Sequence, residues 1–469
     1  NPFKPLPRFN VASGVVCCRT KVMKHTLFAL LTLFFCLSVT ARDKPKPPTG
    51  DYSAHWHQWR GPLGNGMAPK GNPPVKWSET TNLKWKVAIP GSGSATPIVW
   101  GNQIFVVSAI KTDRKPKKIA EQDQPAGRPG GRRFGRMSTP TPTTLYQFVI
   151  LCLDRATGKT LWQKVAIEEV PHEGHHPSHG YASASPITDG KNLYVSFGSR
   201  GVFCFDLDGN QLWQASVGES TNGWGSGCSP LLLGDMLIVN ASVESGSIVA
   251  LDKTSGKELW RSGGIGSSWN TPLLVKTGDT SELVVSVQNN LLGISPSDGT
   301  QLWKADGIHR YVCPSVVAHD GIVYAIGGGH TSLAVRAGGR GDVTDSHTLW
   351  RQTKGSNVSS PIYHQGHLYW FSDGGGFLCC QKADSGETVF QERLEPRPGR
   401  IWSSPVLADG KLYVVSQHNG TYVVAASPEF KFLSHDVFED DNSRTNASPA
   451  VDDGELLMRT DRFLYSIGK

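Results

Sequence analysis

The chain repeats itself, and the period of the repeat limits the folds open to it. A small or polar residue followed by Pro opens an apolar run at eight positions: Pro97, Pro186, Pro230, Pro272, Pro314, Pro361, Pro405 and Pro449. Apart from the first interval, successive openings lie 42 to 47 residues apart. The runs between them are too short for helices, and such a period is typical of propeller blades.

Residues 229–260 show what one unit contains. A first apolar segment begins at Pro230 and ends at a turn, Gly234-Asp235. A second segment covers 236–240 and a third covers 247–251, and after another turn the fourth contains Glu258-Leu259-Trp260. Two-residue turns of the Asp-Gly type recur about four residues after the Pro in other units, because Gly accepts the positive backbone angles of such turns. Each unit is therefore predicted to form four short antiparallel strands.

A closing Leu-Trp ends five of the units, and it predicts how the ring closes. The pair lies at Leu161-Trp162, Leu212-Trp213, Leu259-Trp260, Leu302-Trp303 and Leu349-Trp350, and weakens to Val389-Phe390 in the sixth. No closing strand follows Pro449, whereas 82–87 upstream carries one around Trp85. We expect this N-terminal strand to complete the last blade, since closure removes open sheet edges. The prediction is an all-β, eight-bladed β-propeller with four-stranded antiparallel blades.

Composition supports a turn-rich β protein and narrows the class of partner. The 469 residues include 52 Gly, 30 Pro and 14 Trp. Residues 111–144 hold nine Lys or Arg against three Asp or Glu, so this predicted disordered loop supplies most of the formal charge of +7. The remainder is nearly neutral, and we expect no nucleic-acid partner.

The N-terminal region reads as a series of processing and linking segments. Residues 1–22 precede the first Met and are expected to be a non-physiological leader, followed by a signal peptide over 23–41 with an apolar run too short to span a membrane. Cys36 follows two Phe, which does not suit lipidation. Residues 42–79 are predicted to form a linker and irregular strap, and 80–469 the propeller. We expect an extracytoplasmic protein, periplasmic or secreted, with no membrane span after signal removal.

The blocks CLDRATGKTLW at 152–162 and ALDKTSGKELW at 250–260 resemble the repeat of the pyrroloquinoline-quinone-type propellers. That superfamily contains quinoprotein alcohol dehydrogenases and the propeller lipoprotein of the bacterial outer-membrane barrel assembly machinery. The stretch HWHQWRGPLGNG at 55–66 resembles the leader of secreted planctomycete-type propeller proteins. The resemblance covers about residues 80–469 and implies the fold, whereas the repeat itself is scaffold and defines no site.

The segments just ahead of each Pro should approach the central channel, on the face that carries the loops between blades. Every sizeable insertion is expected on this same face, so we assign it the binding role. Its candidate residues combine aromatic rings, guanidinium groups and amides, which suit a planar, anionic or sugar-like ligand or a peptide. They are Tyr181, Trp224, Trp269, Asn270, His309, Arg310, Tyr311, Asn357, Arg400, Trp402, Arg444 and Asn446. The alternative is that they fill the channel mouth and bond to one another.

Two further clusters are candidates for metal or cofactor chemistry. His172, His175, His176 and His179 lie in one enlarged loop and could supply ligands for zinc or copper, although their spacing matches no established motif. Cys379-Cys380 is similar to the vicinal disulfide of quinoprotein dehydrogenases, but the pair lies within a predicted strand rather than in a loop facing the channel.

These observations leave three functional hypotheses. The first is a non-catalytic scaffold that binds a protein, peptide or glycan on the loop face, with no cofactor. The second is a quinoprotein alcohol or sugar dehydrogenase, with Trp224 or Trp269 stacked on pyrroloquinoline quinone, Arg310 or Arg400 at its carboxylates, and Asn270 or Asn446 near calcium. The third is a metal-dependent enzyme centred on the four histidines.

Overall fold

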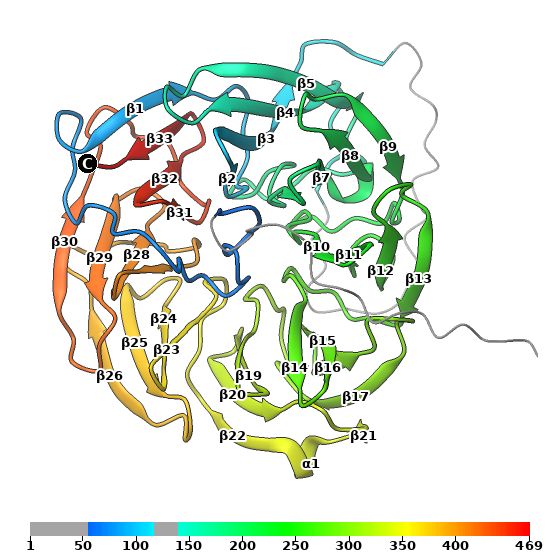
Figure 1. The fold of residues 1–469 in the computed structure, drawn as a ribbon, viewed down its shortest axis with the longest axis vertical. Coiled ribbons are helices and arrows are strands. Elements are labelled where there is room, and N and C mark those ends of the chain that lie inside the picture. Colours follow the sequence, from blue (N-terminus) through cyan, green and yellow to red (C-terminus); the bar gives the residue numbers. More distant parts are fainter. Residues whose placement is uncertain (1–54, 117–138) are drawn as a thin grey trace, which may run out of the picture. The chain divides into compact units, whose positions relative to one another are not determined.

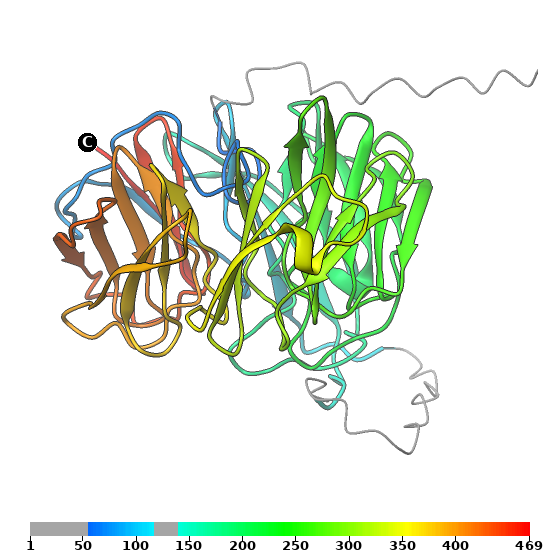
Figure 2. The same ribbon diagram turned by 90° about the horizontal axis from the view of Figure 1, so that it is seen from below.

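In the computed structural model, the described part of the chain forms thirty-three strands in eight sheets that surround a common axis (Figure 1). The structure describes residues 55–116 and 139–469. The predicted leader and signal peptide, and most of the basic 111–144 segment, lie outside the described residues. Figure 2 shows the strands running between two faces of the ring, so that turns and loops gather at each face.

The eight sheets follow one another along the chain, so each blade is a local meander. Blade 1 contains β2 (Ile98–Trp100), β3 (Gln103–Lys111), β4 (Tyr146–Asp154) and β5 (Thr160–Glu169). Blade 2 contains β6 (Ile187–Thr188), β7 (Asn192–Ser196), β8 (Val202–Asp206) and β9 (Gln211–Ala215), with the 3-10 turn η2 (Gly198–Arg200). Blade 3 contains β10 (Leu231–Leu233), β11 (Met236–Ala241), β12 (Ser247–Asp252) and β13 (Glu258–Gly263). Blade 4 contains β14 (Leu273–Thr277), β15 (Thr280–Val287), β16 (Asn290–Ile294), β17 (Gln301–Asp306) and the added β21 (Gly341–Asp342).

The second half of the ring repeats the pattern. Blade 5 contains β18 (Val317–His319), β19 (Ile322–Gly327), β20 (Thr331–Arg336) and β22 (Thr348–Gln352), preceded by α1 (Thr344–His347). Blade 6 contains β23 (Ile362–His364), β24 (His367–Phe371), β25 (Phe377–Lys382) and β26 (Thr388–Arg393). Blade 7 contains β27 (Val406–Ala408), β28 (Lys411–Val415), β29 (Thr421–Ala425) and β30 (Phe432–Asp436). Blade 8 contains β31 (Ala450–Asp452), β32 (Glu455–Arg459), β33 (Phe463–Ile467) and β1 (Leu83–Ala88). The predicted eight-bladed fold is confirmed.

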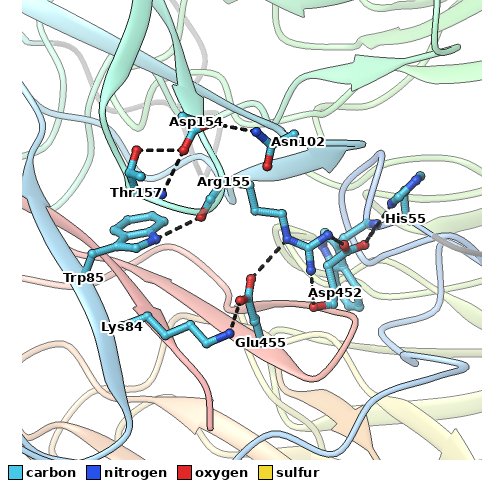
Figure 3. Close-up of polar contacts among 10 residues, drawn as sticks. His55, Lys84, Trp85, Asn102, Asp154, Arg155, Thr157, Asp452 and Glu455 are labelled. Atoms are coloured by element: carbon cyan, nitrogen blue, oxygen red, sulfur yellow. Dashed lines mark hydrogen bonds and ion pairs between the residues drawn. The ribbon is translucent and has the colours of Figure 1, made fainter.

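The ring closes as the sequence predicts, because β1 pairs antiparallel with β33. A network of charges supports the seam with blade 1 (Figure 3). Arg155 of blade 1 reaches Asp452 at 2.5 Å and Glu455 at 3.1 Å, and Glu455 also binds Lys84 of β1 at 2.5 Å. Burial raises the pKa of Asp452, while Arg155 lowers it. The ion pair with Arg155 therefore offsets the cost of holding this carboxylate away from water.

The closing Trp residues join neighbouring blades, as expected from their size. In five blades the indole Nε1 donates to a backbone carbonyl of the next blade: Trp85 to Arg155, Trp162 to Leu207, Trp213 to Lys253, Trp260 to Pro296 and Trp350 to Ala383, at 2.9 to 3.2 Å. The ring lies against a Gly in the last turn of that blade. At Gly256 a Cβ would lie 2.6 Å from Trp213, and the residue has φ of 71°. Both observations require Gly.

Blade 5 lacks this last turn and departs from the repeat. Its residues 337–347 instead add β21 beside β17 of blade 4, in parallel. Trp303 accordingly turns its indole to Glu282 of its own blade, at 2.7 Å, and Glu282 also accepts from the Gly338 amide at 2.9 Å. The expectation that every sizeable insertion lies on the loop face is therefore wrong: this one joins the third and fourth strands and so lies at the opposite face.

A ring of hydroxyl groups lines the channel where the inner strands begin. Each backbone amide in the ring donates to the Ser or Thr hydroxyl of the next blade, at 2.8 to 3.2 Å: Thr96 to Ser185, Ser185 to Ser229, Ser229 to Thr271, Thr271 to Ser315, Ser315 to Ser360, Ser360 to Ser404 and Ser404 to Ser448. Thr96 Oγ1 donates to the Ser448 carbonyl at 3.0 Å, which closes the circle. Six of the seven amides belong to residues that directly precede Pro. Ser315 instead follows Pro314. The ring position is therefore identified by its Ser or Thr hydroxyl rather than by a neighbouring Pro.

Residues 55–77 form a strap across the face that carries the hairpin turns of the blades. The face with these turns is called the turn face below, and the opposite one the loop face. The strap pairs with β27 through Met67 and Leu407, and the Tyr413 hydroxyl donates to the Pro73 carbonyl at 2.9 Å. Its first residues lie near the centre of the ring (Figure 1). The strap therefore covers one mouth of the channel.

The hydroxyl ring should contribute measurably to stability. Ser404→Ala removes the acceptor of the buried Ser360 amide, and an unsatisfied buried donor costs about 1–3 kcal/mol. We expect the free energy of unfolding in urea to fall by that amount. The control Ser297→Ala removes an exposed hydroxyl bonded to Ser295 and should change it by less than about 0.5 kcal/mol. Equal losses in both variants would show that the ring has no special role.

Candidate functional site

A cavity of about 290 Å³ occupies the channel below the loop face. Aromatic side chains from five separate segments line it: Trp59, Trp224, Trp269, Tyr311 and Trp402. Polar groups between them include Asn357, Asp373, Asn446 and hydroxyls of the ring at Ser360, Ser404 and Ser448. We call this space the aromatic cavity. Its mixture of flat apolar surfaces and a few polar atoms is typical of ligand sites.

The strap contributes one wall of the cavity through Trp59. Arg60 follows it and is 2% exposed, with its Nη2 donating to the carbonyls of Asn65 at 2.6 Å and Pro361 at 2.5 Å. Burial lowers the pKa of Arg60 to about 9, so it remains a cation at neutral pH. The bond to Pro361 ties the strap to blade 6 next to Trp59, while the bond to Asn65 is internal to the strap.

The loop 171–180, between blades 1 and 2, spans the loop-face mouth of the channel. Its His176 amide donates to the Gly223 carbonyl at 2.7 Å, and its imidazole stacks on Trp224 with ring centroids 4.4 Å apart. On the other side Arg444 donates to Pro177 O at 2.6 Å, and Asn446 to Ser178 O at 2.8 Å. The loop is therefore fastened to blades 3 and 8 across the channel, and we call it the roof loop.

The structure does not gather the four histidines of the roof loop into a ligand set. No group of three or more His, Cys, Asp or Glu among the described residues is arranged to hold a metal ion. His175 Nδ1 lies 2.8 Å from the His176 carbonyl, His176 stacks on Trp224, and His179 Nδ1 lies 2.8 Å from the Gly180 carbonyl. His172 has no such partner for its buried Nδ1. Each imidazole has its own surroundings, which does not support the zinc or copper hypothesis.

Six of the twelve predicted binding residues line the aromatic cavity: Trp224, Trp269, Tyr311, Asn357, Trp402 and Asn446. Arg400 lies at the rim, with its guanidinium 5.8 Å from the Trp402 ring centroid. Their ligand-binding role stays a prediction.

The other predicted residues have partners elsewhere. Tyr181 donates to the Glu173 carbonyl at 2.9 Å, Asn270 is buried and donates to Ser286 O at 2.5 Å, and His309 lies 2.7 Å from Asp306. Arg310 is exposed beside the backbone of Gly328 and Gly329. Arg444 serves the roof loop and lies 3.0 Å from Asp461. For Tyr181, Asn270 and Arg444, the structure shows the alternative in which polar groups at the channel mouth bond to one another.

The lining does not fit a quinone held with calcium. Calcium prefers six to eight oxygen ligands with several carboxylates. Among the described residues that line the cavity, Asp373 supplies the one carboxylate, and it accepts from Asn357 at 2.9 Å. Asn446 cannot coordinate readily, because its Oδ1 accepts from Gln417 at 2.7 Å while its amide holds the roof loop.

The vicinal cysteines do not cover the cavity. Cys379 and Cys380 lie in β25, and both are buried free thiols. Cys379 packs with Ile326 and Trp370, whereas Cys380 faces Phe390 across the strand pair. Burial raises the pKa of Cys379 to about 12 and that of Cys380 to about 11, so both are unreactive thiols at neutral pH.

Sequence reasoning missed three features of the cavity. Trp59 lies in the HWHQWRG stretch of the predicted strap, and no feature of that stretch indicates that its ring enters the channel. His179 was considered as a metal ligand, yet it lines the cavity. The hydroxyl ring was visible only as the small residue before Pro, a signal that a search for repeated Ser and Thr could have found.

Acidification should loosen the roof loop. Burial is the main cause that lowers the pKa of His179 to about 4; His175, Arg444 and His176 act in the same direction, and the hydrogen bond to the Gly180 carbonyl opposes them. The closed loop therefore binds fewer protons than an open one. Closure is therefore fully favoured above the ordinary pKa of 6.5 and is lost as pH falls from 6.5 toward 4. We expect faster amide exchange over 171–180, corrected for intrinsic rates, at about pH 5 than at about pH 7.5.

Two variants test the assignment to His179. His179→Gln removes the titration and should reduce the pH dependence, leaving a remainder from His172 and His176, whose pKa values are also lowered by burial. His367→Gln, in blade 6 away from the loop, should leave it unchanged. A wild-type roof loop that exchanges equally at both pH values would contradict the argument.

Comparison with known proteins identifies a matching family and several similar proteins. A family model described as outer membrane protein assembly factor BamB matches residues 147–369 and 339–463. The protein of that description from Yersinia pestis is 23% identical over 329 residues, which cover 58% of this chain and 79% of its own length. The protein of that description from Burkholderia pseudomallei strain K96243 is 24% identical over 326 residues, which cover 58% of this chain and 77% of its own length.

Solved structures show the same fold at lower identity. BamB from Moraxella catarrhalis superposes with a TM-score of 0.51 and 13% identity, covering 77% of this chain and 98% of its own. The computationally designed protein Ika8 superposes with a TM-score of 0.50 and 11% identity, covering 71% of this chain and 96% of its own. At such identities the likeness concerns the fold alone. Within the described residues, no helix is both long and apolar enough to cross a membrane.

Proposed function

The chain belongs to the family described as outer membrane protein assembly factor BamB, and we propose that it is a non-catalytic scaffold that binds extended segments of partner proteins at its loop face. The relatives' description supports a role in assembling outer membrane proteins. The predicted signal peptide at 23–41, which lies outside the described residues, supports an extracytoplasmic location, periplasmic or secreted.

The aromatic cavity is the observation that carries the proposal. Trp224 is 39% exposed and Tyr311 is 42% exposed, so both present large aromatic surfaces to solvent. Trp, Tyr and Arg dominate the energy of protein interfaces, because they offer large contact area for few rotatable bonds. Exposed Arg310 and Arg400 near the mouth complete this set.

A peptide side chain explains the cavity better than a sugar does. Several polar groups that could meet sugar hydroxyls already bond within the protein: Asn357 to Asp373, and Asn446 to both Gln417 and Ser178. The aromatic faces remain, and they suit an apolar side chain of a partner segment. We therefore assign the cavity to a peptide, with glycan binding as an outcome that the experiment can reveal.

Trp224→Ala should weaken partner binding about tenfold, or about 1.4 kcal/mol, because the variant loses a central aromatic contact. The probe is an unfolded outer-membrane β-barrel protein diluted from urea, with binding to the full chain followed by fluorescence anisotropy of the labelled probe. Phe432→Ala is the matched control: Phe432 is 38% exposed but lies in the outer strand of blade 7.

Each other outcome would redirect the assignment. Equal binding by wild type and Trp224→Ala would remove the aromatic cavity from the proposal. Displacement of the probe by neutral oligosaccharides would indicate a glycan site. A rise in Tm with pyrroloquinoline quinone and calcium would restore the quinoprotein hypothesis, since a ligand at 100 times its Kd adds about 2.7 kcal/mol of stability.

A further inference from the structure

The strap pairs with the inner strands of three blades at one equivalent position. That position is the second residue after the opening Pro: Val99 in blade 1, Thr188 in blade 2 and Leu407 in blade 7. The Val99 amide donates to the Trp56 carbonyl at 2.8 Å, and the Thr188 amide to His57 O at 3.1 Å. Leu407 makes two backbone bonds with the strap: its amide donates to the Gly66 carbonyl, and its carbonyl accepts from the Ala68 amide, both at 2.8 Å. The inner edges of this propeller therefore accept an added extended chain.

The same edge is open in blade 4. Thr277 and Thr280 flank the two-residue turn of the β14 to β15 hairpin, and the register continues without a shift to Leu273 and Val284. In an antiparallel pair the hydrogen-bonded residues alternate, so Thr277, Val275 and Leu273 bond to β15. The N–H and C=O groups of Leu274 and Lys276 point away from β15. Within the described residues, neither amide nor carbonyl has another backbone partner.

A groove of about 770 Å³ runs along this edge on the turn face. The strap residues Leu63 and Asn65 form one side, β14 forms the floor, and Asp320 and Arg336 belong to the blade 5 side. Leu63 is 53% exposed and Leu274 is 37% exposed. Residues within 336–340 of blade 5 also line the groove, where the chain leaves β20 and turns outward to pair with β17.

The charges in the groove are mostly positive. Its lining includes Lys276, Arg336 and Arg340 against the one carboxylate of Asp320. Within the described residues no ion pair of these three cations is found, and Arg340 Nη1 donates to the backbone carbonyls of Gly338 and Gly339. Asp320 lies 3.4 Å from His319. An occupant with acidic side chains would supply the missing partners.

We propose that β14 and this groove bind an extended, acidic segment of a partner polypeptide by strand addition. Its backbone bonds to the free groups of Leu274 and Lys276, its acidic side chains face Lys276 and Arg336, and its apolar side chains cover Leu63 and Leu274. Main-chain hydrogen bonds supply affinity in this mode of recognition, while the side chains supply specificity. The site lies on the turn face, so it is separate from the aromatic cavity and stands or fails independently of the proposed function.

The test uses a cyclised hairpin peptide added to the full chain, whose free strand carries two successive Glu beside Lys276 and two successive Val beside Leu274. Because successive side chains of a strand point to opposite faces, each face of this strand then offers one Glu and one Val. Two matched peptides carry Lys in place of Glu, or N-methyl groups on the outward amides. We expect the Glu peptide to bind about tenfold more tightly than either of them, as the charges and the main-chain bonds require. Saturation should slow amide exchange of Leu274 and Lys276 about tenfold while leaving Val275 and Thr277 unchanged.

Variants locate the peptide on the edge. Leu274→Pro removes an amide that β15 does not use, and should reduce the affinity about tenfold. Leu232→Pro, at the equivalent position of blade 3, should leave it unchanged. Lys276→Glu should reverse the preference to the Lys peptide, and it decides the matter if circular dichroism shows that Leu274→Pro does not fold. Absence of binding at millimolar Glu peptide, or unchanged exchange at Leu274, would overturn the proposal.

Discussion

At seven of the eight junctions between blades, a backbone amide beside the channel donates to a hydroxyl of the next blade, and at the eighth the Thr96 hydroxyl donates to the Ser448 carbonyl. Inner strands of a propeller are short and leave one edge unpaired, so their first amides would be buried without a partner. Ser360 and Ser404 show the solution, since each accepts from the preceding blade and donates its own amide to the following one. A hydroxyl at this position satisfies the backbone without filling the channel, and the space above it remains as the aromatic cavity.

The outer rim is joined by a second repeated contact, and blade 5 departs from it. Where Trp213 meets Gly256, ring and turn fit because the Gly lacks a Cβ. Blade 5 lacks that turn, and Trp303 is satisfied by Glu282 within its own blade. The segment that replaces the turn adds β21 to the outside of blade 4, and its Gly338 and Arg340 line the groove beside β14. A departure from the repeat thus supplies both an extra outer strand and part of the wall of the groove.

The fold could be predicted because its determinants are local and repeated. The closing Trp, the turn residues and the displaced strand around Trp85 each appear in the sequence at the place where the structure uses them. The cavity was predictable in part, since residues ahead of each Pro must approach the axis. The sequence did not reveal which of these residues face the channel. Asn446 and Arg444, for example, bind a loop that begins some 270 residues earlier, and no local sequence pattern encodes such a pairing.

The remaining features depend on how segments cross the channel, which a repeat does not specify. The strap closes one mouth and places Trp59 below the cavity, while the roof loop spans the other mouth and rests His176 on Trp224. A ligand that enters from the loop face must therefore displace imidazole from indole, or slide beneath the roof loop. The strap is held more firmly than the roof loop, because Arg60 is buried and bonded to blade 6. It follows that the roof loop controls access to the cavity, and that the turn face can bind a partner only along edges that the strap leaves uncovered.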